Sequence, residues 1–182
     1  MAAGLSISVE PFESAEALKL VAALDAELGA LYPPENRFGP RFTARHAKEG
    51  RGTFLVVRLE GKAVGCGAFT LLDHVTAEVK RMYVAPEVRG RGAGRAVLDR
   101  LETKAKALGV DRLVLETGIH QHDAIRLYER AGFTRIECWG DYAAVPTSVC
   151  YEKIIRSEVA RQEAPIPKER RFRRDDRTSA DQ

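Results

Sequence analysis

The fold of this chain is decided by the stretch Glu78-Val-Lys-Arg-Met-Tyr-Val-Ala-Pro-Glu-Val-Arg-Gly-Arg-Gly-Ala-Gly94 and by the sequence that follows it to Leu108. Its first part, residues 79–84, is rich in β-prone residues and predicts a strand that stops at Pro86. Glycines stand at positions 90, 92 and 94, and apolar residues then recur with helical spacing. This stretch therefore predicts a strand, a glycine-rich loop and a helix.

The glycine-rich loop has the features of an anion-binding site. Its glycines remove side chains where backbone N–H groups must approach a phosphate, and the start of the next helix adds unsatisfied N–H groups and the positive end of its dipole. Positive charge in the same few residues is suited to forked contacts with phosphate oxygens, and it comes from Arg89, Arg91 and Arg95. The loop is thus a candidate phosphate-binding site.

Two segments resemble motifs of one known family. Arg89-Gly-Arg-Gly-Ala-Gly94 resembles the R/Q-x-x-G-x-G/A pyrophosphate loop of the GNAT superfamily of N-acetyltransferases, which binds acetyl-coenzyme A. A second segment, Ala124-Ile-Arg-Leu-Tyr-Glu-Arg-Ala-Gly-Phe133, resembles the superfamily's A-x-x-L-Y-x-x-x-G-F segment. Both occur in the superfamily's order within residues 53–155. The resemblance implies a bacterial-type enzyme that transfers an acetyl group from acetyl-coenzyme A to a primary amine.

The resemblance also implies where the cosubstrate binds. Its pyrophosphate would lie on the loop residues Arg89, Gly90, Arg91, Gly92, Ala93, Gly94 and Arg95. Its pantetheine arm would contact the backbone of Met82, Tyr83 and Val84, which would also help to polarise the thioester carbonyl. Gln121 stands where many members have an asparagine that contacts the pantetheine, and its amide is expected to keep that contact.

The implied reaction is direct attack of the amine on the thioester, with no covalent enzyme intermediate, and it needs two proton transfers. Tyr128 occupies the position of the superfamily tyrosine that donates a proton to the leaving sulfur; the alternative is an aromatic residue packed on the sheet. Glu78, at the start of the central strand, is the candidate base for the amine. The alternatives are a relayed water as the base and a surface role for Glu78.

Residues for the acceptor side are less sharply indicated. Tyr32 and Glu35 belong to an irregular segment, residues 32–40, that is a candidate wall of a substrate pocket or a surface connection stiffened by prolines. Asp141 and Tyr142, between the last two strands, either reach the acceptor or form a turn. His120 and His122 lack a third ligand at useful spacing, and a polar helix entrance explains the pair better. We therefore predict no metal site.

Length and composition predict one domain with a tail. A chain of 182 residues with 45% apolar content can bury one core, and we expect residues 1–156 to form the acetyltransferase domain and residues 157–182 a charged, disordered tail. The net charge of +3 does not by itself require nucleic acid. Without a signal peptide or a span of membrane length, the prediction is a cytoplasmic protein, monomeric or homodimeric. The cysteines, Cys66, Cys138 and Cys150, are expected to be small, buried and reduced.

The predicted fold class is α/β (mixed α+β), with a mostly antiparallel sheet of about seven strands and helices on both faces. The segment 112–117 follows a helical crossover and should lie parallel to residues 79–84. Ser14 is predicted to cap the first helix, which would bury Leu18, Val21, Leu24, Leu28 and Leu31. The helix after the glycine loop would bury Val97, Leu98, Leu101, Ala105 and Leu108.

Three other functions compete with this prediction. An NAD(P)-binding domain requires G-x-G-x-x-G, but Arg95 stands at the last glycine position and the chain after Glu116 is short for a doubly wound domain. A non-catalytic acyl-coenzyme A-binding regulator would not need Tyr128. Nucleic-acid binding by the basic run Lys168–Arg174 is opposed by acidic residues in the same tail. A small-molecule amine is the favoured acceptor over a protein or peptide, because no acidic groove for a basic peptide is evident.

Overall fold

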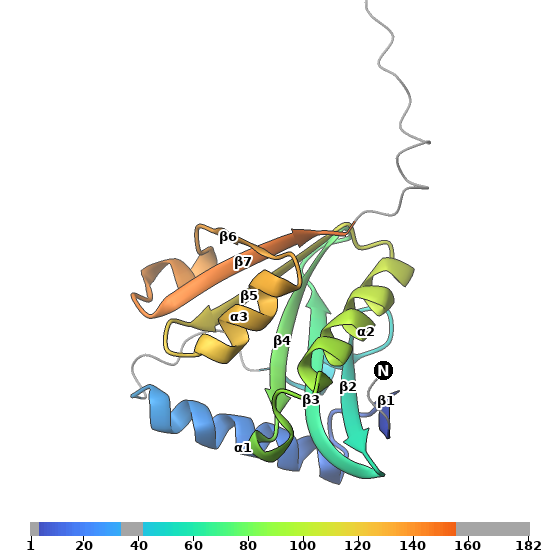
Figure 1. Ribbon diagram of the computed structural model, residues 1–182. Helices are drawn as coiled ribbons and strands as arrows, with labels where there is room; N and C mark the ends of the chain where they lie inside the picture. The colour runs from blue at the N-terminus through green and yellow to red at the C-terminus, as the bar shows by residue number, and fades with distance from the viewer. Residues whose placement is uncertain (1–3, 34–41, 156–182) are drawn as a thin grey trace, which may run out of the picture.

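The computed structural model describes residues 4–33 and 42–155, which form a seven-stranded sheet with helices on both faces (Figure 1). The strands are β1 (Leu5–Val9), β2 (Gly52–Leu59), β3 (Lys62–Leu71), β4 (Thr76–Val84), β5 (Arg112–Gly118), β6 (Thr134–Ile136) and β7 (Ser148–Ile154). The α-helices are α1 (Ala15–Leu31), α2 (Ala93–Ala107) and α3 (His122–Arg130), and short 3-10 helices are η2 (Ala44–Ala47), η3 (Pro86–Val88) and η4 (Gly140–Ala144).

The sheet has the order β1-β2-β3-β4-β5-β7-β6 and is mostly antiparallel. The one parallel pair is β4 with β5, joined through α2, in the register Thr76↔Arg112 to Val79↔Leu115. The predicted fold class and the predicted parallel pair are both confirmed. Because β4 and β5 are parallel, their C-terminal ends and the loops that follow lie on the same side of the molecule (Figure 1).

Alternating residues of the central strands make two separate cores. Leu55 and Val57 of β2 pack in the core under α2, whereas Phe54 and Val56 pack in the core under α1. This alternation follows from the two-residue period of a strand. Each helix contributes the apolar stripe that covers its face of the sheet: Ala17, Leu20 and Val21 from α1, and Val97, Leu98, Leu101 and Ala105 from α2.

The predicted helix faces need two corrections. Ser14 does cap α1, since its side chain accepts a hydrogen bond from the Ala17 amide. Val21 and Leu24 are buried as predicted, but Leu18 and Leu31 are exposed, because the buried stripe of α1 is completed by Ala17 and Leu20. Leu108 is exposed because α2 ends at Ala107 and Gly109, with a φ of 79°, turns the chain away.

A β-bulge in β4 separates this strand from β5. Cys66 pairs with Tyr83 and Ala68 with Lys80, so Gly67 opposes two residues, and Arg81 has a φ of 57°. A bulge bends its strand and shifts the alternation of side chains. Lys80 and Arg81 consequently both face α1, and pairing between β4 and β5 ends at Val79↔Leu115. Figure 1 shows the two strands apart at their C-terminal ends.

Gly67 of β3 lies very close to side chains of α2 and β4. A Cβ atom there would lie 2.5 Å from a methyl group of Val97 and 2.6 Å from the sulfur of Met82. Only glycine leaves room for both side chains on the α2 face. The glycine therefore lets α2 pack directly against the bulged part of the sheet.

The expectation of three reduced, buried cysteines is wrong for Cys138 and Cys150, which form a disulfide. The β6–β7 register places Ile136 opposite Cys150, and Cys138 follows two residues later with its Cα 5.1 Å from that of Cys150. The pairing depends on strand register, which spacing along the chain does not reveal. Cys66 is free and buried as expected, and burial raises the pKa of its thiol to about 12.

This pairing predicts a specific thiol count. Protein unfolded in guanidinium without reductant should release one reactive thiol, that of Cys66, and three after reduction. In the folded protein Cys66 should not react, because burial keeps its thiol protonated and inaccessible. Titration with a chromogenic disulfide reagent measures each number. Three thiols in the unreduced, unfolded protein would contradict the disulfide.

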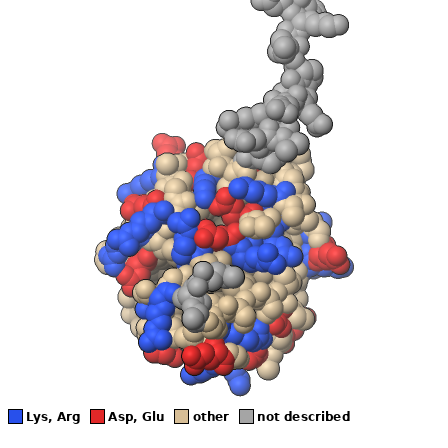
Figure 2. Space-filling view, turned by 45° about the vertical axis from the view of Figure 1, so that its right-hand side comes forward, with Lys and Arg blue, Asp and Glu red and all other residues tan. Residues whose placement is uncertain are grey.

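The remaining surface features are unexceptional. On the face drawn in Figure 2, basic and acidic side chains are interspersed. Within residues 4–33 and 42–155, no helix has both the length and the apolar character needed to cross a membrane. The predicted tail, residues 157–182, lies outside the described residues.

Candidate active site

The glycine-rich loop presents its backbone to open space at the start of α2. Gly90 and Gly92 have φ values of 77° and 83°, a conformation that side-chain-bearing residues rarely adopt, and a Cβ on either would meet no atom within 4 Å. Gly92 is the N-cap of α2, whose first amide groups have no intrahelical acceptor. The loop thus has the conformation and the free donors of an anion-binding site.

Two of the three loop arginines are held by other protein groups. The Arg89 Nε donates to the carbonyl oxygen of Val84 at 2.9 Å, and its guanidinium pairs with Glu27 of α1 at 2.6 Å. Arg95 pairs with Asp99 at 2.8 Å and donates to the Arg130 carbonyl oxygen. The amides, more than these two side chains, are therefore the groups available to a ligand. Direct phosphate contact by Arg89, Arg91 or Arg95 stays a prediction.

β4 and β5 are unpaired beyond Val79 and Leu115, and this unpaired stretch, called the slot below, leads to the loop because β4 ends at Val84, shortly before it. Gly94, at the start of α2, lies close to both α3 and the end of β4, since a Cβ on it would lie 3.2 Å from Leu127 and 3.6 Å from Val84. Beyond Val79 and Leu115 the facing edges of the strands have no ladder partner in each other. The predicted pantetheine contacts, Met82, Tyr83 and Val84, are half-buried along this slot. The Val84 carbonyl oxygen is already engaged by Arg89.

Gln121 holds the turn between β5 and α3. Its side-chain oxygen accepts hydrogen bonds from the Gly118 amide at 2.9 Å and the Thr117 hydroxyl at 3.0 Å. The oxygen is therefore occupied, and only the amide nitrogen of its side chain remains to donate to a ligand. If the side chain of Gln121 contacts the pantetheine as predicted, it does so through its amide nitrogen.

Tyr128 lies in the core between α3 and the sheet, only 5% exposed, with its ring against Phe133. Burial, with a smaller contribution from the charge of Glu116, raises the pKa of Tyr128. Among the described residues, the hydroxyl of Tyr128 has no hydrogen-bond partner. Every fully buried side-chain polar atom in the same residues does have a partner. The hydroxyl must therefore reach an accessible surface, and its raised pKa keeps it in the form that can donate a proton.

Glu78 lies in a buried polar triad on the α1 face of the sheet. It is 4% exposed, and its Oε1 accepts hydrogen bonds from the Lys80 ammonium and from the Tyr142 hydroxyl, each at 2.8 Å. Lys80 also donates to the Tyr142 oxygen at 2.7 Å. Burial and the neighbouring charge of Glu78 raise the pKa of Tyr142, so its hydroxyl stays protonated. The triad links β4 to η4.

Glu116 lies on the same face, at the first position of β5 beyond the paired part of β4. It is half-buried, and its Oε1 accepts a hydrogen bond from the Ser148 hydroxyl at 2.6 Å. Among the described residues it has no salt-bridge partner within 4.0 Å. Burial raises the pKa of Glu116, and the charge of Glu78 adds to this, while Ser148 and Lys80 lower it.

The other predicted acceptor-side residues fall in different places. Tyr32 is buried against Gly118, and its hydroxyl accepts a hydrogen bond from the His120 amide at 2.9 Å. Asp141 is exposed beside Tyr142 in η4. Glu35 lies outside the described residues. His120 stacks on Tyr32, and within the described ranges no group of three or more His, Cys, Asp or Glu side chains is placed to hold a metal ion.

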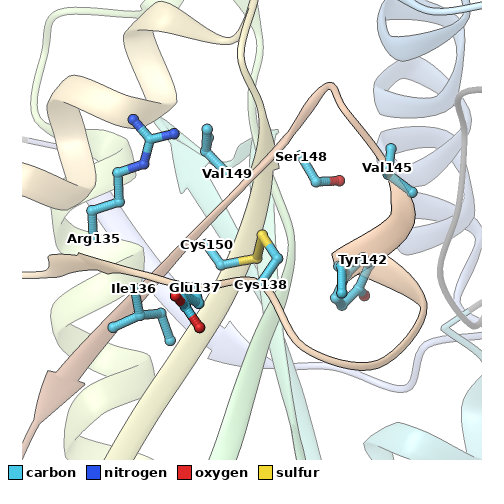
Figure 3. A pocket seen from close by; sticks show the side chains of 10 residues that line it. Arg135, Ile136, Glu137, Cys138, Tyr142, Val145, Ser148, Val149 and Cys150 are labelled. Carbon is cyan, nitrogen blue, oxygen red and sulfur yellow. A yellow bond between two sulfur atoms is a disulfide. The ribbon is translucent and has the colours of Figure 1, made fainter.

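A cavity of about 500 Å³ opens beside the polar residues of the α1 face. Tyr142 and Ser148, which contact Glu78 and Glu116, both line it, and the Cys138–Cys150 disulfide forms part of its wall (Figure 3). Figure 3 shows these groups on the segment that leaves β6 and returns as β7. The cavity has space for a small ligand, and its link to the two carboxylates runs through Tyr142 and Ser148, since Glu78 and Glu116 do not line it themselves.

Sequence reasoning missed three of these polar residues: Lys80, Glu116 and Ser148. A signal was present, since Glu78 and Lys80 lie two positions apart in a strand predicted to be central and Glu116 interrupts the apolar run of the next strand. Charged residues within buried strands are rarely tolerated without a partner or a function. Ser148 has no comparable signal, because only the β5–β7 register brings it to Glu116.

Comparison with known proteins gives a consistent result. A profile of the acetyltransferase (GNAT) family matches residues 20–133. A relative named IAA acetyltransferase, from Azospirillum brasilense, is 39% identical over 75% of this chain and 88% of its own length. An uncharacterised N-acetyltransferase of Bacillus subtilis, YsnE, is 33% identical over 63% of this chain and 71% of its own.

Solved structures share the fold. A Klebsiella pneumoniae protein assigned as an acyl-CoA N-acyltransferase superimposes with a TM-score of 0.71 at 35% identity, covering 84% of this chain and 98% of that one. A GNAT family acetyltransferase from Elizabethkingia anophelis, crystallised with acetyl-CoA bound, gives a TM-score of 0.60 over 84% of this chain and 99% of that one. At 18% identity the second likeness concerns the fold alone.

Proposed function

Because this chain belongs to the GNAT family of acetyltransferases, we propose that it transfers an acetyl group from acetyl-coenzyme A to the primary amine of a small molecule. The observation that carries this proposal is the continuity of three features: the open glycine loop, the slot where β4 and β5 part, and the polar residues beyond it. A phosphate-bearing thioester needs these three environments in this order.

The loop and the slot would hold the cosubstrate. The amides of residues 90–95 would receive its pyrophosphate, with the positive end of the α2 dipole favouring the negative charge. The free edge of β4 would take the amides of the pantetheine arm, so that the arm replaces the ladder partner missing between β4 and β5. Acetyl-coenzyme A supplies an activated acetyl group whose carbonyl carbon an amine can attack.

Protein groups then manage the protons of a direct transfer. The hydroxyl of Tyr128 would donate to the departing sulfur, because its raised pKa keeps it protonated near neutral pH. An ammonium acceptor has a pKa near ~10 and must lose a proton before attack. Two carboxylates on the α1 face are the candidates to receive that proton: the predicted base Glu78, which already pairs with Lys80, and its neighbour Glu116.

The acceptor would occupy the cavity beside these carboxylates. A volume of about 500 Å³ fits a small molecule, and its lining includes Tyr142 and Ser148. The predicted roles of Tyr32, Asp141 and Glu35 in acceptor binding stand as proposals. A small amine is favoured over a peptide because the site is a pocket between η4 and β7.

Steady-state assays of coenzyme A thiol release test the function. The protein should release free thiol from acetyl-coenzyme A faster in the presence of some members of a panel of small primary amines, with stoichiometric acetylamide by mass spectrometry. A panel of lysine-containing peptides and protein N-terminal peptides is the comparison. Transfer to peptides alone would refute the small-molecule acceptor, and no transfer to either panel despite acetyl-coenzyme A binding would favour a non-catalytic binding protein.

A further inference from the structure

We propose that Glu116 is the general base that takes the proton from the acceptor amine, and that Glu78 is a positioning residue that fixes Lys80 and Tyr142 beside it. This assignment rests on the proposed function and deepens it. It replaces the sequence-based choice of Glu78 by a residue whose geometry fits the task better.

The position of Glu116 in the sheet is the first reason. It is the first residue of β5 after the paired register Val79↔Leu115, so it lies where the slot begins. Its side chain is on the α1 face, where it accepts from Ser148. Ser148 also lines the cavity, so it connects an amine bound there to Glu116, which stands at the start of the slot that would hold the acetyl group.

The second reason is that the Glu116 carboxylate has fewer hydrogen-bond and ion-pair partners than that of Glu78. Glu78 already has a lysine ammonium and a tyrosine hydroxyl on one oxygen, so its charge is neutralised by Lys80. Glu116 has only the Ser148 hydroxyl, and its second oxygen has no donor among the described residues. A carboxylate whose charge is not matched by a contacting cation can receive an ammonium group and then its proton.

The electrostatic surroundings of Glu116 are the third reason. The groups that face it are Lys80 and Glu78 of β4, Ser148 of β7, Tyr142 of η4, Tyr32 at the end of α1 and Tyr128 of α3. Burial is the main cause of the raised pKa of the three tyrosines, and the negative charge of Glu116 is a further cause for each. Glu116 is therefore close enough to interact electrostatically with Tyr128. The proposed base lies on the α1 face of β5, and the proposed acid lies in the core on the opposite face of the sheet.

Every proton in the acetyl transfer has a donor and an acceptor. The ammonium gives one proton to the Glu116 carboxylate, and the neutral nitrogen forms a bond with the carbonyl carbon as the carbon–sulfur bond breaks. The thiolate takes a proton from Tyr128. The second proton of the nitrogen replaces the one that Tyr128 gave, and Glu116 releases its proton to solvent.

Two isosteric variants separate the roles. Glu116→Gln keeps a hydrogen-bond acceptor for Ser148 but removes the base, so kcat should fall by about 10²- to 10⁴-fold. The fall of kcat/KM toward low pH, called the acid limb, should also disappear from its pH profile. Glu116→Asp should retain part of the rate. Glu78→Gln should retain the acid limb even if the rate falls, because it changes the positioning of Lys80 and Tyr142 and leaves the base in place.

Thermal unfolding gives a readout independent of turnover. Because the folded pKa of Glu116 is raised, its stabilising contribution is complete at low pH and is lost as pH rises through the folded pKa. Glu116→Gln should therefore raise Tm at neutral pH, with the gain vanishing in acid. Glu78→Gln should lower Tm at neutral pH, since it leaves the Lys80 ammonium, 12% exposed, without its counter-charge.

The outcomes are distinguishable. A wild-type protein that neither binds acetyl-coenzyme A nor acetylates any amine overturns the proposed function and this assignment together. An active wild type with an unchanged acid limb in Glu116→Gln overturns the assignment alone, as does loss of that limb in a folded Glu78→Gln variant. Loss of the limb in Glu116→Gln only, with partial rescue by aspartate, supports it.

Discussion

Replacing Tyr128 with phenylalanine is expected to lower kcat by about 10²- to 10⁴-fold while acetyl-coenzyme A still binds with unchanged affinity. The variant removes one oxygen from a ring that is otherwise held by the core under α3 and by Phe133. Since the hydroxyl has no protein hydrogen-bond partner among the described residues, the fold loses little. Single-turnover thiol release and calorimetric binding measure the two quantities separately.

A matched control exists in the same core. Tyr151 of β7 is also buried, 3% exposed, but its hydroxyl donates to Glu129 at 3.1 Å. Tyr151→Phe should cost roughly 0.5–1.5 kcal/mol of stability, as for a lost hydrogen bond, and leave kcat within about twofold. Equal rates in wild type and Tyr128→Phe would remove Tyr128 from the mechanism.

The second large effect is expected at the glycine loop. Gly92→Val places a branched side chain at a φ of 83°, at the N-cap of α2 where the proposed pyrophosphate would bind. The strain of roughly 1–2 kcal/mol also turns the first amides of α2 away from their present direction. We expect the dissociation constant for acetyl-coenzyme A to rise at least about tenfold, which calorimetric titration measures.

Gly109→Val supplies the control at the other end of α2. Gly109 has a φ of 79° and open space around its Cβ position, so the backbone strain is the same. It should lower Tm to a similar extent without changing affinity for acetyl-coenzyme A. If both variants weaken binding equally, general destabilisation rather than the loop is responsible, and the proposed pyrophosphate site is refuted.

The fold could be predicted largely because its signals are local. The strand, loop and helix of residues 78–108 are specified by β-prone residues, a proline, three glycines and a helical spacing, all close in sequence. The handedness of the crossover then fixed β5 as the parallel neighbour of β4. Exposed Leu18 was assigned wrongly because a helical period alone does not say where the edge of the buried stripe lies, and exposed Leu108 because the period does not say where the helix ends.

The polar part of the site could not be predicted, because register and loop path build it. Tyr142 is 64 positions from Glu78, and Ser148 is 32 from Glu116; their contacts require the β5–β7 register and the position of η4. The Cys138–Cys150 disulfide depends on the β6–β7 register in the same way. Glu78 could be proposed as a base from its place at the start of the central strand, but its hydrogen-bond partners Lys80 and Tyr142 could not be predicted.

Thermal unfolding with and without acetyl-coenzyme A tests the central claim most directly, with NADP as the comparison ligand. If the loop and slot bind acetyl-coenzyme A, a concentration about 100 times the dissociation constant should add roughly 2.7 kcal/mol of stability and raise Tm, while NADP should not. An unchanged Tm at saturating acetyl-coenzyme A, or equal stabilisation by NADP, would contradict the acetyltransferase site described for this chain.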